Sequence, residues 1–330
     1  VDGFDGLVLV GKGNVLIDGG GAGSALTVSN AFGVFVDKLD LRGGDPHGLV
    51  ITDSSEVVVE KIDVEGGVGD GIHVERSTYL IVEKVTVTGG AGAGIRMDDT
   101  DFVLIEKVRI EAVGGDGISL SAGLPETSDD IWVLKALILD VGGDGIDMNG
   151  IFNVVAKSKV FGAGGDGMRI ESTAGSDSFF LANMVKDVGG DGFELAGEDD
   201  WAIKNKVLSP GGAGVRLGGA GDHLVVAVKI TKPQAEGVVI ETGADDCSVQ
   251  ATKITGSVLT GFVVDSDFNY LGGNKVSKAG AHGVHATGTS NMLEKNKASG
   301  SEVFDLSDTA GGNTYEKNKF GSVDPGGFEP

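Results

Sequence analysis

The sequence predicts an all-β solenoid, in which one small unit of strands and turns repeats along the chain. Apolar and polar residues alternate over short stretches, and no segment keeps a helical period. Glycine supplies 58 of the 330 residues, a proportion that would strongly destabilise helices. A glycine followed by an apolar, a variable and an apolar residue recurs every 22 to 28 residues. This phrase begins at Gly48, Gly71, Gly94, Gly117, Gly145, Gly167, Gly192, Gly214, Gly237, Gly261 and Gly283.

Each repeat is long enough for three short strands, and each strand is expected to pair in parallel with its counterpart one coil further on. Glycine-rich runs such as residues 66–69 are expected to supply the positive φ angles of the corners. About 13 coils of 22–25 residues then form three parallel sheets around an apolar core. The pattern resembles the right-handed parallel β-helix of the pectate-lyase-like superfamily over nearly the whole chain. That superfamily includes lyases, hydrolases, epimerases, adhesins and scaffolds, so the resemblance implies the fold and no single activity.

Two further periodic signals indicate stacked coils. Asn274, Asn296 and Asn318 follow one another at intervals of 22 residues, which predicts a buried asparagine ladder bonded from coil to coil. An acidic residue followed by lysine recurs every 23 residues and is expected at one corner. These pairs are Asp37-Lys38, Glu60-Lys61, Glu83-Lys84 and Glu106-Lys107.

The chain is predicted to be one domain, residues 1–330, because no linker rich in Pro or Ser divides it. Residues 1–47 are expected to form the first coils without an evident N-terminal cap, 48–300 the regular coils, and 301–330 the last coil and a tail. The sequence contains no transmembrane run and no recognisable signal peptide. The single cysteine, Cys247, excludes an internal disulfide framework and is expected in the core.

The formal net charge of −23 argues against nucleic acid as a partner, because phosphates would be repelled. An acidic polysaccharide would need a local basic groove or bound divalent cations to offset the same repulsion. For an acidic solenoid with almost no cysteine, the resemblance to this superfamily implies an extracellular, cell-surface or periplasmic location of the bacterial type. We therefore expect an exported protein that is not inserted in a membrane.

The outward face of the glycine-led strand is the place to look for chemistry, because the superfamily usually carries catalytic residues there. The residues two and four places after each glycine are charged in many coils. Opposite charges one coil apart also stabilise each other and fix the register, so a purely structural role explains them as well. This face is predicted to hold Glu75, Arg96, Asp98, Arg169 and Glu171, and an alternating ladder of Asp147, Arg169, Glu194 and Arg216.

Few aromatic residues are available to form sugar-binding platforms. The chain has two Trp and three Tyr, and the alternation around Trp132 and Trp201 is compatible with burying both. This composition weighs against a sugar-binding surface.

Asp45-Pro46-His47 resembles the Asp-Pro-His core of the mannuronan C5-epimerases, which share this fold. That family has a tyrosine three residues before the aspartate, where this chain has Arg42, and a lysine from an earlier coil, for which Lys12 is the candidate. The resemblance implies that His47 and a partner exchange the C5 proton while Arg42 or Lys12 neutralises the sugar carboxylate. A turn initiated by Asp-Pro explains the same residues without any catalysis.

The catalytic candidates under this resemblance are therefore few. Glu75 falls where the family carries an acidic residue on the next coil, and Arg96 lies on the same predicted face. They complete the set Asp45, His47, Glu75 and Arg96.

An aspartate precedes the repeat glycine in several coils. Such side chains commonly bond to the turn backbone. A column of carboxylates at about 5 Å would nevertheless be repulsive unless it is hydrated or bridged by cations, so calcium is a candidate ligand. The predicted metal residues are Asp116, Asp144, Asp166 and Asp191, with Asp70 at the same corner of an earlier coil.

The regular repeat, the low aromatic content and the exposed solenoid ends favour a non-catalytic exported scaffold that assembles head to tail with itself, modulated by calcium. No cofactor is required for this function. The alternative is a polysaccharide-active enzyme, a uronate lyase or C5-epimerase, that uses the outward face. A carbohydrate-binding adhesin is a third hypothesis, and it predicts aromatic residues on an outer face.

Overall fold

The computed structural model describes residues 1–13, 15–121, 129–171 and 176–324. It divides into two compact units, Val1–Gly165 and Asp166–Pro330, each described by itself below. The described residues form 41 short strands joined by turns. Among them, no helix is long and apolar enough to cross a membrane. The single domain that the sequence predicts stays a prediction.

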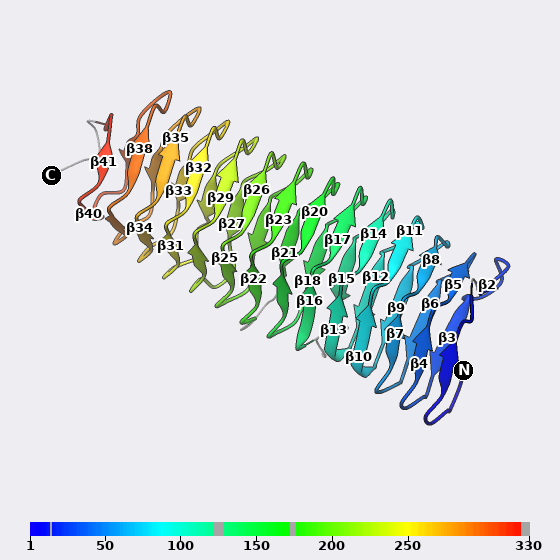
Figure 1. Cartoon of the computed structure of the whole chain (residues 1–330). Helices are drawn as coiled ribbons and strands as arrows, with labels where there is room; N and C mark the ends of the chain where they lie inside the picture. Colours follow the sequence, from blue (N-terminus) through cyan, green and yellow to red (C-terminus); the bar gives the residue numbers. More distant parts are fainter. Residues whose placement is uncertain (14, 122–128, 172–175, 325–330) are drawn as a thin grey trace. The chain divides into compact units, whose positions relative to one another are not determined.

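Unit 1 contains three parallel sheets, and Figure 1 shows the strands of each sheet following one another coil by coil. Sheet A consists of β3 (Leu26–Ser29), β6 (Leu49–Thr52), β9 (Ile72–Glu75), β12 (Ile95–Asp98), β15 (Ile118–Ser121) and β18 (Ile146–Met148). Sheet B consists of β1 (Val8–Val10), β4 (Phe35–Asp37), β7 (Val58–Glu60), β10 (Thr78–Glu83), β13 (Asp101–Glu106), β16 (Ile131–Leu134) and β19 (Val154–Ala156). Sheet C consists of β2 (Leu16–Asp18), β5 (Asp40–Arg42), β8 (Asp63–Glu65), β11 (Thr86–Thr88), β14 (Arg109–Glu111), β17 (Leu137–Leu139) and β20 (Lys159–Phe161).

Unit 2 repeats the same arrangement of three parallel sheets. Its sheet A consists of β21 (Met168–Ile170), β24 (Phe193–Leu195), β27 (Val215–Leu217), β30 (Val238–Ile240), β33 (Phe262–Val264), β36 (Val284–Ala286) and β39 (Leu306–Asp308). Its sheet B consists of β22 (Phe179–Leu181), β25 (Trp201–Ile203), β28 (Leu224–Val226), β31 (Ser248–Gln250), β34 (Tyr270–Gly272), β37 (Met292–Glu294) and β40 (Thr314–Glu316). Its sheet C consists of β23 (Met184–Lys186), β26 (Lys206–Leu208), β29 (Lys229–Thr231), β32 (Lys253–Thr255), β35 (Lys275–Ser277), β38 (Lys297–Ser299) and β41 (Lys319–Phe320).

The core of each unit is a column of side chains from the inward positions of the strands. In β9, for example, Ile72 and Val74 are fully buried, whereas His73 and Glu75 between and after them face outward. Each strand pairs in parallel with the strand one coil away, as in the register Ile72↔Ile95. The predicted β-solenoid with three parallel sheets is confirmed.

The repeat glycines are required by close approach of neighbouring groups and not by positive φ. A Cβ on Gly71 would overlap Val87 Cγ1 in the core and lie 2.8 Å from the carbonyl oxygen of Gly94. A Cβ on Gly67 would overlap the carbonyl oxygen of Gly44 one coil earlier. The prediction that residues 66–69 supply positive φ is wrong. Positive φ occurs instead at other corners, for example at Lys61 (φ 54) and Lys84 (φ 56).

Both predicted ladders are confirmed. Lys84 Nζ lies 2.8 Å from Glu83 and 3.2 Å from Glu60, so it pairs with acidic residues of its own coil and the one before, as Lys61 and Lys107 also do. The Asn274 amide donates to Asn296 Oδ1 at 2.9 Å, and Asn296 Nδ2 donates to the carbonyl of Leu271 at 2.7 Å. Each asparagine side chain, buried at Asn274 and Asn296 and half-buried at Asn318, therefore bonds to backbone groups of earlier coils.

Cys247 is fully buried and has a free thiol, as predicted. Burial raises the pKa of this thiol to about 12, which keeps it protonated and unreactive at neutral pH.

Candidate functional site

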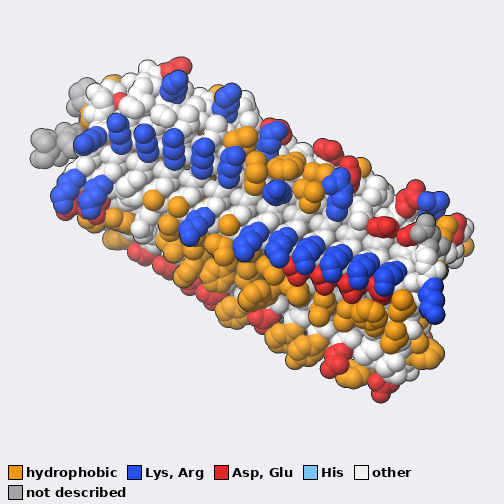
Figure 2. All heavy atoms as spheres, viewed as in Figure 1, with side chains coloured by type: hydrophobic (Ala, Val, Ile, Leu, Met, Phe, Trp, Pro, Cys, Tyr) orange, Lys and Arg blue, Asp and Glu red, His pale blue; other side chains and the backbone are white. Residues whose placement is uncertain are grey.

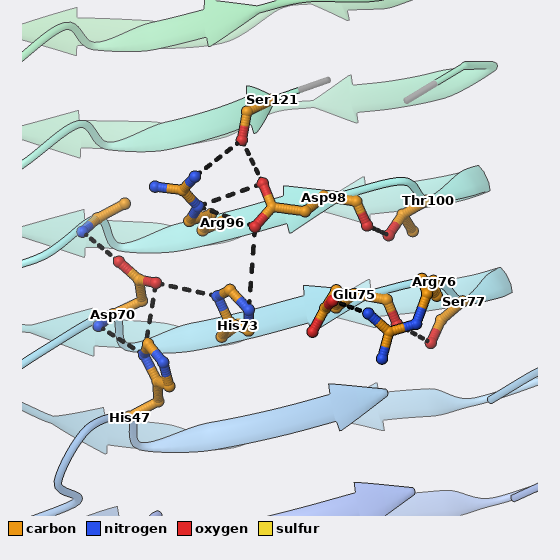
Figure 3. Close-up of polar contacts among 11 residues, drawn as sticks. His47, Asp70, His73, Glu75, Arg76, Ser77, Arg96, Asp98, Thr100 and Ser121 are labelled. Carbon is orange, nitrogen blue, oxygen red and sulfur yellow. Dashed lines mark hydrogen bonds and ion pairs between the residues drawn. The ribbon is translucent and has the colours of Figure 1, made fainter. Parts of the chain in front are cut away.

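Three titratable side chains of unit 1 meet on the outward side of sheet A (Figure 3). His47 lies in the turn before β6, and Asp70 occupies the same place one coil later, in the turn before β9. His73 projects outward from β9 because its neighbours Ile72 and Val74 point into the core. The repeat of 23 residues thus brings His47 against Asp70, and three residues of turn and strand bring His73 to the same carboxylate.

Asp70 joins the two imidazoles. Its Oδ1 accepts the backbone amide of Ala93 at 2.8 Å, which orients the carboxylate. Its Oδ2 lies 3.1 Å from His73 Nδ1 and 3.4 Å from His47 Nδ1. His47 Nδ1 also accepts the backbone amide of Asp70 at 3.0 Å, so this nitrogen carries a lone pair. The two rings stack with centroids 4.5 Å apart and planes inclined by 13°.

The charges of this cluster are coupled. Burial lowers the pKa of His47, and the neighbouring His73 lowers it further, while Asp70 opposes both effects. Burial alone would raise the pKa of Asp70. The hydrogen bond from His73, the Ala93 amide and the two imidazoles outweigh that effect and lower it. Asp70 is therefore a carboxylate at neutral pH.

The next coil adds a second layer of polar groups. Arg96 Nε donates to Asp98 Oδ2 at 3.0 Å, and its Nη2 donates to Ser121 Oγ at 3.1 Å. Ser121 Oγ also donates to Asp98. Asp98 Oδ2 lies 3.9 Å from His73 Nε2, so His73 stands between two carboxylates. The hydrogen bond to Asp98 raises the pKa of the Arg96 guanidinium, which remains a fixed positive charge.

Two of the four predicted catalytic residues, His47 and Arg96, belong to this group. Among the described residues, Asp45 and Glu75 form no hydrogen bond or ion pair with this cluster. Asp45 is exposed and precedes Pro46 through a cis peptide bond. Glu75 forms an ion pair with Arg76, further along β9 (Figure 3).

The two cations proposed for the epimerase-like site also lie elsewhere. Arg42 forms an ion pair with Glu65 on sheet C, and Lys12 is exposed. The sequence placed Asp70 among the corner aspartates, but we did not predict that it joins His47 and His73 in one cluster. The signal was present, because Asp70 follows His47 by one period of 23 residues and His73 follows a repeat glycine by two.

The corner aspartates bond to the backbone of the following coil. In unit 1, Asp116 Oδ1 accepts the Asp144 amide at 2.8 Å. In unit 2, Asp166 Oδ1 accepts the Asp191 amide at 2.6 Å. Within the described ranges, His47, Asp70 and His73 are the one group of three such ligands close enough to hold a metal ion. Calcium binding at Asp116, Asp144, Asp166 and Asp191 stays a prediction.

The outward face of sheet A in unit 2 carries the predicted alternation of charge. Arg169 Nε lies 3.1 Å from Glu194, and Arg216 lies 2.5 Å from Asp191 and 2.7 Å from Glu241. Burial raises the pKa of Glu194 to about 7, helped by a hydrogen bond with Asp166. Each arginine pairs with two carboxylates, Arg169 with Glu171 and Glu194 and Arg216 with Asp191 and Glu241, as the structural explanation of the ladder predicts.

A second feature of unit 1 is an apolar groove on the outer side of sheet B. Figure 2 shows hydrophobic side chains gathered over β10, β13 and β16, beside a row of lysines. The groove has a volume of about 410 Å³. The groove residues are Tyr79, Leu80, Ile81, Phe102, Val103, Leu104, Asp130 and Trp132.

Two rows of side chains define this groove. Tyr79 and Phe102 form the corner row, where their rings stack at 5.0 Å with planes inclined by 7°. Ile81, Leu104 and Trp132 form the strand row, paired in register across β10, β13 and β16. The aromatic side chains are about half exposed, at 56% for Tyr79, 48% for Phe102 and 50% for Trp132.

The expectation that alternation buries the tryptophans is wrong. Trp132 is 50% exposed and Trp201 is 38% exposed, because both occupy outward positions between inward ones. Trp201 of unit 2 meets Phe179 edge to face, with centroids 5.1 Å apart.

These features define a parallel β-helix with a polar cluster and an aromatic groove on different sheets of one unit. The family model for the right handed beta helix region matches residues 24–183 and 173–323. The chain therefore belongs to the right-handed β-helix family. No curated protein matches the chain.

Several solved structures share the fold. The tailspike receptor-binding domain of Siphovirus 9NA matches all of this chain and 74% of its own, with 12% identity and a TM-score of 0.67. A tailspike protein of E. coli bacteriophage HK620, solved with a pentasaccharide, matches 94% of this chain and 70% of its own, with 11% identity and a TM-score of 0.59. The A-module of an Azotobacter vinelandii mannuronan C-5 epimerase matches 90% of this chain and 86% of its own, with 15% identity and a TM-score of 0.56. At these identities the similarity shows the fold alone. The chain also spans 62% of the catalytic domain of a GH87 α-1,3-glucanase.

Proposed function

We propose that this chain is a polysaccharide-binding β-helix and that the aromatic groove of unit 1 holds the glycan. The observation that carries the proposal is the exposure of Tyr79, Phe102 and Trp132 in one groove of about 410 Å³. Soluble proteins seldom leave large contiguous apolar surfaces uncovered unless a ligand or partner uses them. The volume also falls within the range of ligand-binding clefts.

The backbone at the corner row supports a specific role for its rings. Tyr79 and Phe102 both have φ of 57°, in the left-handed region that bulky residues rarely adopt. The same turn holds Glu56 (φ 56) one coil earlier and Asp130 (φ 54) one coil later, so the turn itself does not need an aromatic residue. Aromatic residues are thus placed there against local preference, which is typical of positions with a function.

The groove matches the chemistry of a pyranose chain. A sugar ring has an apolar face that packs on aromatic rings and a rim of hydroxyl groups that need polar partners. The aromatic rings and Leu104 supply the apolar surface. The Asp130 carboxylate at its edge can accept hydrogen bonds from sugar hydroxyl groups. The lysines beside the groove are paired, as Lys84 is with Glu83 and Glu60, so little positive charge is left over. With a net charge of −23 as well, neutral or weakly acidic glycans fit better than a strong polyanion.

Retention on a panel of immobilised neutral and acidic polysaccharides tests the proposal. Phe102→Ala and Trp132→Ala are expected to weaken binding about tenfold or more, since central aromatic anchors dominate such interfaces. Phe268→Ala is the matched control, because Phe268 is 61% exposed at a turn of unit 2 with φ of 60°. If all three variants bind the polysaccharide as the wild type does, the proposal that this groove binds the glycan is refuted.

The enzymatic alternative has one observation in its favour. Asp70 and His73 form a carboxylate–imidazole pair with Arg96 on the next coil. Such a pair orients a histidine as a base, and an arginine can hold a sugar carboxylate. This supports a uronate lyase or C5-epimerase as second candidate, with His73 in the role that the Asp-Pro-His motif suggested for His47. Absorbance near 235 nm on uronate polymers, with NMR for epimerised residues, tests it. Unchanged polymers would remove this candidate.

The self-assembling scaffold and the exported location stay predictions. Assembly is the competing use of an exposed apolar sheet, because a second copy can cover the same groove. Sedimentation velocity of the wild type and Trp132→Ala separates the two uses. Large species lost in the variant would assign the groove to self-association.

A further inference from the structure

We propose that His47, Asp70 and His73 form a binding site for one divalent transition ion of the zinc class. One ligand atom from each of these three side chains lies within 4.8 Å of the other two. A tetrahedral ion with bonds of about 2.0–2.1 Å holds its ligand atoms about 3.3 Å apart. The distances of 3.4 Å and 3.1 Å from Asp70 Oδ2 to the two nitrogens match that spacing.

The donor set selects the class of ion. Two imidazole nitrogens and one carboxylate oxygen suit zinc and its neighbours, whereas calcium and magnesium prefer oxygen ligands. The Ala93 amide occupies Asp70 Oδ1, so Oδ2 is the oxygen that faces the imidazoles. All three side chains keep some contact with solvent, which leaves room for water as a fourth ligand.

A carboxylate lies behind one of the ligands. Asp98 Oδ2 lies 3.9 Å from His73 Nε2, beyond hydrogen-bond distance, and a carboxylate that closes on a ligating histidine would fix its ring and strengthen the ligand. Arg96 and Ser121 in turn hold Asp98. The guanidinium thus bonds directly to Asp98, and its charge reaches Asp70 only from a longer distance.

Ion binding requires two local changes. The Asp70 amide donates to His47 Nδ1 at 3.0 Å, and the ion takes over this lone pair. The imidazoles are nearly parallel, inclined by 13°, and must tilt because each lone pair lies in the plane of its ring. The ion also replaces the contact between His73 Nδ1 and Asp70, so loading excludes the base arrangement of the enzymatic candidate. The site is independent of glycan binding in the groove.

Titration of the chelator-treated full chain with Co²⁺, followed by visible absorption, and with Zn²⁺, followed by calorimetry, tests the site. One ion per chain is expected, with d–d bands of a tetrahedral Co²⁺ complex and a shifted Asp70 amide resonance. Asp70→Asn and His73→Ala are each expected to weaken binding more than about 100-fold, beyond the cost of losing an outer partner.

His285→Ala is the matched control and is expected to bind like the wild type, since His285 holds the same outward position on β36 of unit 2. Asp70→Asn keeps an oxygen for the Ala93 amide, so it decides the question even if His73→Ala folds poorly. Absence of saturable binding, or binding that survives Asp70→Asn and His73→Ala, would overturn the proposal. No substrate enters this experiment, so its outcome is separate from that of the glycan-binding tests.

Discussion

Asp200 of unit 2 is a buried carboxyl group that pairs with no lysine or arginine among the described residues, and replacing it by asparagine should stabilise the protein at alkaline pH. Its side chain is fully buried. Ser176 and the amides of Ser178 and Gly197 donate to it. His223 is close but accepts the Asp200 amide through Nδ1 and contacts the Gly218 carbonyl through Nε2, so its ring is neutral. Burial lowers the pKa of His223, which keeps its imidazole neutral.

Burial raises the pKa of Asp200 from 3.8 to about 7. A carboxyl group whose pKa is higher in the folded than in the unfolded protein ionises more readily after unfolding. The free energy of unfolding is therefore highest below pH 3.8 and falls as the pH rises toward 7. The difference of about three pH units corresponds to on the order of 4 kcal/mol between these limits. Asp200→Asn removes this loss, because an amide does not ionise.

Asparagine can keep two of the three hydrogen bonds, since its Oδ1 can accept from Ser176 and the Ser178 amide, whereas the Gly197 amide loses its acceptor. Asn269 lies in the equivalent turn of a later coil, where its Oδ1 accepts the Cys247 amide at 2.8 Å. Urea unfolding at pH 5 and pH 8, followed by circular dichroism, measures the effect. We expect Asp200→Asn to exceed the wild type by about 1 kcal/mol or more at pH 8, with a smaller difference at pH 5.

Asp222→Asn is the control for the change of charge, since Asp222 is exposed beside His223. The Asp222→Asn variant should show the same pH dependence of the free energy of unfolding as the wild type. If Asp200→Asn were equally destabilised at both pH values, Asp200 would be ionised and stabilised in the folded protein, and the reasoning would fail.

Three further predictions concern packing, the asparagine ladder and calcium. Gly71→Ala should destabilise unit 1 by about 1–3 kcal/mol, because its methyl group would overlap Val87; an unchanged urea midpoint would contradict the close approach. Asn296→Ala should cost about 1–3 kcal/mol for each buried backbone group that it leaves unpaired, measured by the same unfolding and compared with Gln234→Ala, an exposed amide outside the ladder. If calcium bridges the corner aspartates, sedimentation velocity in millimolar calcium should differ from that in chelator, and Asp116→Asn should reduce the difference; identical profiles would contradict it.

The fold was predictable because a solenoid repeats its signal in every coil. Alternation such as that of Ile72, His73 and Val74 identifies the inward and outward positions of sheet A, and the same alternation recurs at the next glycine. The reason for the glycines was not predictable. Whether Gly71 serves a positive φ or a close approach depends on how far Val87 reaches across the core, which is a tertiary distance.

The candidate sites were only partly predictable. His47 and Arg96 were identified. The Asp-Pro-His motif, however, directed attention to Asp45, which lies near His47 in the sequence, and away from Asp70, whose carboxylate lies against His47 in space. The aromatic groove was missed for a different reason. Tyr79 and Phe102 each precede an inward residue, and both have a positive φ. Hydrophobic alternation carries no information about φ, so it did not indicate that these two rings are exposed.

The fluorescence of Trp132 tests glycan binding in the aromatic groove most directly. The chain has two tryptophans, so Trp201→Phe leaves Trp132 as the single reporter and Trp132→Phe leaves Trp201. A polysaccharide retained in the panel should shift the emission of the Trp201→Phe variant saturably and leave that of the Trp132→Phe variant unchanged. A shift confined to the Trp132→Phe variant, or no shift in either while the polysaccharide binds, would contradict glycan binding at Tyr79, Phe102 and Trp132.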